Sequence, residues 1–351
     1  MNTASATNPM LGIFIFMLGG LAGAVFYLPF SRVKKWAWES YWFVYALIGL
    51  VVVPWALAYF TAPNTLAVLR AAPRQEIVYC LVCGALWGFG GLTWGLMIRY
   101  LGVGLGLAMG AGLTSATGTL IPPMLKGSAA VRAMVATTGG KISLAAALVS
   151  LVGIVCVGLA GRSKESELPE EVKRKTVAEF DFRKGLIAAL FSGLMSSAMS
   201  FGLQGGPGIQ KLSLTTEPVT TVTWAGIPVL VVVLMGGFVV NGGWCLILNF
   251  KNRTAGDYVS GPVAGNLLFA AVAGAIWCAQ FVCFKTGEPK MGSTSYIGWA
   301  VLMAASILFS QLLGIALGEW KGTGAKTRGL LAAGLVLLLG SSVLAGVAGS
   351  L

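Results

Sequence analysis

Residues 263–284 read VAGNLLFAAVAGAIWCAQFVCF, and this run contains no charged side chain. About 20 residues, each rising 1.5 Å in a helix, cross the hydrocarbon core of a bilayer. Similar apolar runs recur along the whole 351-residue chain, in which only 10% of the residues are charged. A soluble domain carries about 25% charged residues, because its entire surface faces water. The pattern therefore predicts an all-α integral membrane bundle.

On both sides of this run, charged residues and turn residues mark the ends of further apolar segments, which gives ten segments in all. One long polar connection, 162–184, divides them into two sets of five and holds both basic and acidic residues. We expect an N-terminal five-helix repeat over 1–161, a charged cytoplasmic linker over 162–184 and a C-terminal five-helix repeat over 185–351. The ten transmembrane helices are expected at 10–30, 37–60, 76–98, 101–124, 141–161, 185–206, 218–248, 263–285, 294–318 and 328–349.

The two halves share short matches in the same order. Trp87 and Trp277 are 190 residues apart, and Gly102 and Gly292 are separated by the same distance in sequence. Glu39 and Glu217 are 178 residues apart. Two copies of five helices must insert with opposite orientation, so the matches predict two inverted repeats of the kind found in secondary transporters. Chance matches in a chain with 49 glycines are the alternative.

The basic residues predict the orientation. With the N-terminus outside, the loops on the inside carry 16 Lys and Arg and those on the outside carry 8. Positive loops stay in the cytoplasm, so we expect a multi-pass protein of the bacterial inner membrane with both termini periplasmic. Because the net charge of +12 is spread over short loops, it does not indicate a nucleic-acid partner. The expected partners are a small-molecule sugar and the lipid bilayer, and no oligomeric state is predicted.

Two residue types limit the chemistry. The chain has no histidine, and its six cysteines lie in apolar stretches where small packing residues are expected. We therefore expect no metal site, no catalytic residue and no cofactor apart from a coupling proton. A membrane enzyme acting on a metal–diphosphate would need clustered carboxylates, and the apolar segments contain no such cluster.

The carboxylates fall outside the middle of the predicted spans, which leaves two candidates for proton coupling. Glu39 lies in the first turn of the second span between tryptophans, and Glu217 precedes Pro218 at the predicted start of the seventh. A partly desolvated carboxylate exchanges protons closer to neutral pH than an exposed one. The alternative for both is an interfacial acid favoured by a helix N-terminus.

Neutral polar and aromatic residues inside the spans are the candidates for binding substrate. A sugar has many hydroxyl groups and apolar faces, so its site needs amides or hydroxyls beside aromatic rings. Gln280 lies one turn beyond Trp277 on nearly the same helix face. Tryptophans near helix ends, such as Trp320, are expected instead to be interface anchors. The predicted substrate-binding residues are Tyr27, Trp87, Trp94, Gln204, Trp277 and Gln280.

Several stretches resemble the L-rhamnose–proton symporter family, within the drug/metabolite transporter superfamily. They are GAVFYLPFSRVKKWAWE at 23–39, GALWGFG at 84–90, MIRYLG at 97–102, WCAQF at 277–281 and GEWK at 318–321. The resemblance covers nearly the whole chain, although 204–211 and 285–295 depart from the family pattern. It implies proton-coupled uptake of a neutral sugar, most naturally L-rhamnose, by alternating access. An exporter of drugs, amino acids or other metabolites from the same superfamily is the alternative.

Overall fold

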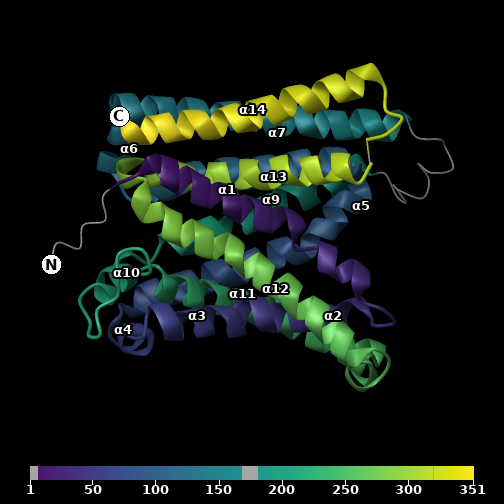
Figure 1. Ribbon diagram of the computed structural model, residues 1–351, viewed down its shortest axis with the longest axis horizontal. Helices are drawn as coiled ribbons and strands as arrows, with labels where there is room; N and C mark the ends of the chain where they lie inside the picture. The colour runs from purple at the N-terminus through teal and green to yellow at the C-terminus, as the bar shows by residue number, and fades with distance from the viewer. Residues whose placement is uncertain (1–6, 168–180, 319) are drawn as a thin grey trace.

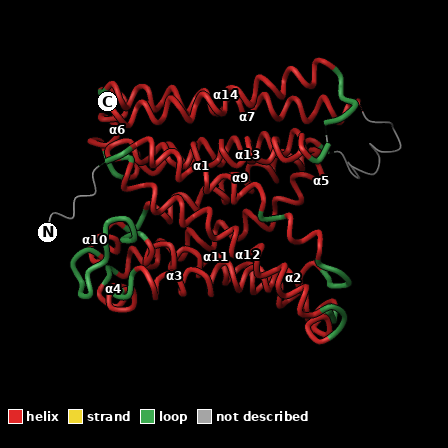
Figure 2. The backbone as a smooth tube through the Cα atoms, viewed as in Figure 1, coloured by secondary structure: helices red, strands yellow, loops and turns green. Residues whose placement is uncertain are grey.

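The computed structural model describes residues 7–167, 181–318 and 320–351. Within these ranges every regular element is a helix and no strand occurs (Figure 2). Helices satisfy all their backbone hydrogen bonds internally, which is what a lipid environment requires. The predicted all-α class is therefore confirmed for the part of the chain that is described.

Long helices form the body of the bundle, and short helices lie near its ends (Figure 1). The short ones are the 3-10 turn η1 (Leu28–Arg32), α4 (Thr65–Ala71), α6 (Ser128–Ala136), α10 (Pro207–Ser213) and the 3-10 turns η3 (Ala255–Val259), η4 (Glu288–Lys290) and η5 (Gly292–Ile297). The long ones are α1 (Pro9–Val25), α2 (Trp38–Leu47) continued through a π-turn (Ile48–Val52) into α3 (Val53–Thr61), α5 (Arg74–Leu125), α7 (Thr138–Glu167), α9 (Phe182–Gln204), α11 (Ile227–Asn252), α12 (Val263–Gly287), α13 (Gly298–Ala316) and α14 (Ala325–Ser350).

Nine helical segments of the described residues are long and apolar enough to cross a membrane. They correspond to nine of the ten predicted spans. The remaining one, 101–124, belongs to the second part of α5 and includes residues whose side chains are not described. It stays a prediction.

Helix α5 is not straight. Thirteen residues along a straight helix cover about 20 Å, yet a Cβ placed on Gly110 would lie only 2.7 Å from Sδ of Met97. Met97, Trp94 and Met109 also belong to one hydrophobic cluster. The chain therefore turns back on itself between Met97 and Gly110, and the two parts of α5 lie side by side without an intervening loop.

The bundle has two distinct ends. At the terminal end, Asn8 N–H donates to Lys290 O at 3.0 Å and Met10 lies against Gly346, so the beginning of α1 and the end of α14 are neighbours. At the linker end, Gly324 N–H donates to the Glu167 carboxylate at 2.7 Å. The helices run between these two ends, which lie left and right in Figure 1.

Helices from the two predicted halves are interleaved. Helix α7 pairs along its length with α14, α5 packs against α9, and α1 packs against α12 and α13 (Figure 1). Every one of these pairs joins a helix that begins in the first predicted half to a helix that lies almost wholly in the second. The halves consequently share one core.

The predicted start of the seventh span is wrong. Helix α11 begins at Ile227, whereas residues 218–226 form turns. Thr220 N–H donates to Ser213 O, and the Thr220 hydroxyl donates to Asn64 at 2.8 Å, which fixes the segment outside a helix. Glu217 is therefore an exposed loop residue, and its carboxylate accepts from the nearby Val219 N–H.

Candidate functional site

A cavity of about 740 Å³ lies inside the bundle, within the range of small-molecule sites. Its wall is built by α1, α2, α5, α7, α9, α11, α12 and α13. Five of the six predicted substrate-binding residues line it, together with Asn241 and Gln311. These five are Tyr27, Trp87, Trp94, Trp277 and Gln280.

Aromatic rings form one side of the cavity. The ring centroids of Trp87 and Trp277 are 4.9 Å apart, and those of Trp277 and Phe281 are 4.5 Å apart. Tyr45 stands edge-on to Trp277 at 6.0 Å and packs against Trp42 at 4.7 Å. Because these rings brace one another, their faces are held in fixed positions. Such faces match the apolar C–H faces of a sugar ring.

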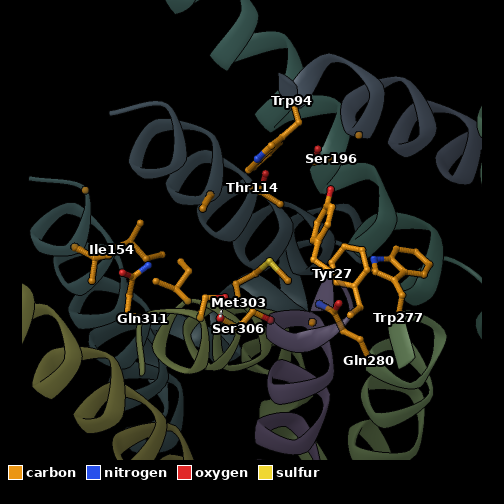
Figure 3. Close-up of a pocket in the computed structure, with 18 of the residues that line it drawn as sticks. Tyr27, Trp94, Thr114, Ile154, Ser196, Trp277, Gln280, Met303, Ser306 and Gln311 are labelled. Atoms are coloured by element: carbon orange, nitrogen blue, oxygen red, sulfur yellow. Dashed lines mark hydrogen bonds between the residues drawn. The ribbon is translucent and has the colours of Figure 1, made fainter. Parts of the chain in front are cut away.

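Polar groups without an intramolecular partner face the same space. Across the described ranges, the side chains of Tyr27, Ser196, Gln280 and Gln311 form no hydrogen bond with the protein. Figure 3 shows the Tyr27 hydroxyl pointing toward the side where Ser196 lies, with Gln280 beside Trp277. An amide and hydroxyls left open in a membrane protein are suited to a ligand that brings its own hydrogen-bonding groups.

A glycine makes room for the Gln280 amide. A Cβ on Gly23 of α1 would lie 2.7 Å from Gln280 Oε1 and 2.8 Å from Ser306 Oγ. Both approaches are too close for real atoms, so any side chain at this position would displace the amide or the hydroxyl. Ser306 is anchored by its bond to Leu302 O at 3.0 Å, whereas Gln280 is not anchored.

Other polar residues hold the walls together. Trp42 donates its indole N–H to Asn241 Oδ1 at 3.3 Å, and Asn241 donates in turn to Gly237 O. On the other side, the Trp299 indole donates to Thr114 O at 3.1 Å. These bonds orient the aromatic rings, and the cavity is consequently formed before any ligand binds.

The cavity extends to the linker end. Gly161, Lys164 and Glu165 of α7 line this part, and Trp320 lies beside them. The Lys164 ammonium stands 4.8 Å above the Trp320 ring, a cation–π arrangement. Trp320 was expected to be an interface anchor, and its indole also forms part of the cavity wall.

Glu39 lies at the start of α2 and is 6% exposed. Its carboxylate accepts hydrogen bonds from Asn252 Nδ2 at 2.9 Å and Thr254 Oγ1 at 3.0 Å, both beyond or at the end of α11. It is not among the cavity-lining residues, but Trp42, one turn further along α2, is. Its role in proton coupling stays a prediction.

Gln204 is separate from the cavity. It is buried at the end of α9, where its Nε2 donates to Ser200 Oγ at 2.8 Å and its Oε1 has no partner among the described atoms. The sixth span, expected over 185–206, is interrupted close to its predicted end, because α9 ends at Gln204 and α10 begins at Pro207.

Sequence reasoning missed several lining residues. Trp42 and Tyr45 follow Glu39 at helical spacing, and this spacing was a usable signal for a shared face. Ser306 and Ser310 stand out less, because single serines are frequent in apolar helices. The missed residues with polar or aromatic side chains include Trp42, Tyr45, Thr114, Ser196, Trp299, Ser306 and Ser310.

Comparison with known proteins gives a consistent result. The family model described as L-rhamnose-proton symport protein matches residues 5–349. An L-rhamnose-proton symporter of Shigella dysenteriae serotype 1 is 30% identical over 345 residues, covering 96% of this chain and 97% of the relative. Symporters of the same name from Escherichia coli strains ATCC 8739 and 55989 are 29% and 30% identical over the same shares.

Proposed function

Because this chain belongs to the L-rhamnose–proton symport family, we propose that it takes up L-rhamnose or a closely similar neutral sugar together with protons. The observation that carries this proposal is the cavity, where unpartnered amide and hydroxyl groups stand beside braced aromatic rings. No observation favours the exporter alternative. The family consists of transporters and not of enzymes, so no enzymatic activity is proposed.

We assign the sugar ring to the aromatic end of the cavity, where Trp87 and Trp277 offer their faces and Gln280 and Tyr27 offer polar atoms. Trp94 extends the same wall. The amide of Gln280 both donates and accepts, which suits adjacent sugar hydroxyls. In the present arrangement Gln204 does not reach this place, and its contribution belongs to another conformation.

The chain is proposed to have ten spans in two inverted repeats, 1–161 and 185–351, joined by a linker over 162–184. The return of α5 at Met97 and Gly110 supports a tenth passage. The contact of Trp87 with Trp277 supports the repeats, because two residues related by a two-fold axis touch only where they meet that axis.

The linker end is proposed to face the cytoplasm and the terminal end the periplasm of the inner membrane. The uneven distribution of Lys and Arg supports this orientation. With this orientation, the lining of the cavity by Lys164 and Glu165 at the linker end supports the proposal of an inward-facing state. Alternating access then requires a second state that opens at the other end.

Proton coupling is assigned to Glu39. Its carboxylate joins α2 to the end of α11 through Asn252 and Thr254. Protonation removes the charge that both donors stabilise, so these contacts weaken and α2, which carries Trp42, is released. Glu217 was the second predicted coupling residue. Its side chain is exposed, so its protonation would change few contacts between helices.

The test is uptake into proteoliposomes. Radiolabelled L-rhamnose should accumulate when the lumen is alkaline relative to the medium, and a protonophore should abolish the accumulation. Counterflow without a gradient should persist in both conditions. A protein that shows neither accumulation nor counterflow with L-rhamnose would refute the proposed substrate, and accumulation that is indifferent to the protonophore would refute the coupling.

A further inference from the structure

Lys285 is a buried cation at the terminal end, opposite the linker end where Lys164 and Glu165 line the cavity. It lies near the end of α12 and its side chain is 1% exposed. A charged side chain inside a membrane bundle is costly unless it is paired, and such residues are usually functional. Neither the sugar site nor the proposed coupling residue uses Lys285.

Three acceptors hold the Lys285 ammonium. It forms an ion pair with Glu288 of η4, donates to Leu203 O at 2.9 Å and to Gln210 Oε1 at 3.4 Å. Leu203 belongs to the last turn of α9, where carbonyl groups lack helical partners and the helix dipole favours a positive charge. The Lys285 side chain of α12 thus bonds to α9 and to α10, on the two sides of the break between them.

The surroundings are shaped for this cation. A Cβ on Gly226, which precedes α11, would overlap Cε of Lys285, so only glycine leaves room for the stem. Glu76, another carboxylate at this end, is already used by the N–H groups of Gly208 and Ile209. Glu288 is therefore the carboxylate that pairs with Lys285.

Phe284, which precedes Lys285, and Trp299 of the cavity wall form a packed aromatic layer. Phe284 is fully buried and stands edge-on to Trp299, which lines the cavity, at 5.7 Å. Beside this layer lie Ser200 and Gln204, both buried, and Gln204 Oε1 has no partner within the described structure. An unsatisfied amide oxygen costs free energy in a dry interior, and that cost disappears when a water-filled path reaches it.

Helix α12 connects the two places. Gln280 in the cavity and Lys285 are five residues apart, about 7.5 Å along the helix axis. A displacement of α12 when a ligand contacts Gln280 is transmitted over this distance, because a helix is rigid over two turns. The sugar site and the ion pair therefore move as one body.

We propose that Lys285 and Glu288 are the lock of a gate at the terminal end, and that Gln204 lines the path that opens when the lock breaks. This inference rests on the proposed function in that it assumes alternating access. In the structure the lock is closed. In the opposite state the hydrogen bonds from Lys285 to Leu203 O and Gln210 Oε1 are broken. The Phe284 and Trp299 rings separate, and the Gln204 side chain becomes accessible to water.

The test uses Gln204→Cys as a reporter in a full-length chain whose six native cysteines are replaced by alanine. The purified protein in detergent is treated with a polar maleimide, and the labelling rate is measured without sugar. Glu288→Gln keeps the shape and removes the charge, and Lys285→Met removes the cation. Because breaking a buried pair is strongly destabilising to the state that contains it, each change should raise the labelling rate at least about tenfold.

Lys211→Met is the matched control, because Lys211 is an exposed lysine on α10 at the same end. It should label at the parent rate. Gly226→Ala provides a third variant that displaces the Lys285 stem with both charges retained, and it should also accelerate labelling. Size-exclusion elution shows which variants are folded.

Parent-like labelling in folded Glu288→Gln and Gly226→Ala proteins would overturn the gate, as would equal acceleration by Lys211→Met. Since no sugar takes part, this result is independent of whether L-rhamnose is the substrate. Failure of the uptake experiment together with accelerated labelling would refute the substrate and leave the gate in place.

Discussion

The space left by Gly23 allows a sharp test of the sugar site. In Gly23→Ala the new methyl group would begin 2.7 Å from Gln280 Oε1 and 2.8 Å from Ser306 Oγ. The Gln280 amide is the end of a flexible side chain without an anchor, so it moves away by about 1 Å to restore van der Waals contact. A shift of that size spoils hydrogen-bond geometry.

The expected loss follows from one hydrogen bond to the sugar. A net contribution of about 1 kcal/mol corresponds to an approximately fivefold weaker Kd. Stability should move in the other direction, because alanine is favoured over glycine inside a helix by about 0.5–1 kcal/mol. Affinity for L-rhamnose would be measured by isothermal titration calorimetry, and Tm by a thermal-shift assay on the same preparation.

Gly243→Ala of α11 is the matched control, since its Cβ would meet nothing within 4 Å. It should leave affinity unchanged. Unchanged affinity in Gly23→Ala, with a Tm at or above that of the parent, would refute the placement of the sugar beside the Gln280 amide. A lower Tm would show instead that the methyl group disturbs the backbone.

Three further changes have defined outcomes. Gln280→Ala should abolish the quenching of tryptophan fluorescence by L-rhamnose, and full quenching at the parent concentration would remove Gln280 from the site. Glu39→Gln retains an acceptor for Asn252 and Thr254, so counterflow should persist while gradient-driven uptake is lost; normal uptake would exclude Glu39 from coupling. Asn64→Ala leaves Thr216 O and the Thr220 hydroxyl without their partner, and Ser213 O keeps only its bond from Thr220 N–H. This loss should cost about 2–4 kcal/mol in denaturant unfolding, and a change below about 0.5 kcal/mol would contradict the expectation.

Most helices could be located from sequence, because an apolar run in a bilayer must satisfy its backbone hydrogen bonds internally and does so as a helix. Segment 263–284 is an example, since α12 begins at Val263 as expected. Residues 218–226 are an exception. They read as apolar, but Asn64 and Ser213 bind Thr220 and keep the segment in turns, and such contacts between distant residues are invisible in a hydropathy pattern.

The cavity was predictable in part for a similar reason. Trp277 and Gln280 could be placed on one face from helical spacing alone, and both line the cavity. Gln204 has the same chemistry and does not line it. The difference is its position: Gln204 is buried at the end of α9 and bonded to Ser200, and this three-dimensional placement does not follow from residue type.

The pairing of α7 with α14 has a consequence for biogenesis. A membrane protein emerges from the ribosome in order, so α7 (Thr138–Glu167) enters the bilayer before α14 (Ala325–Ser350) has been made. Until α14 is inserted, the face of α7 that later meets it stays covered by lipid or by the insertion machinery. A nascent chain that stops short of α14 therefore lacks this partner and is a natural substrate for membrane proteases.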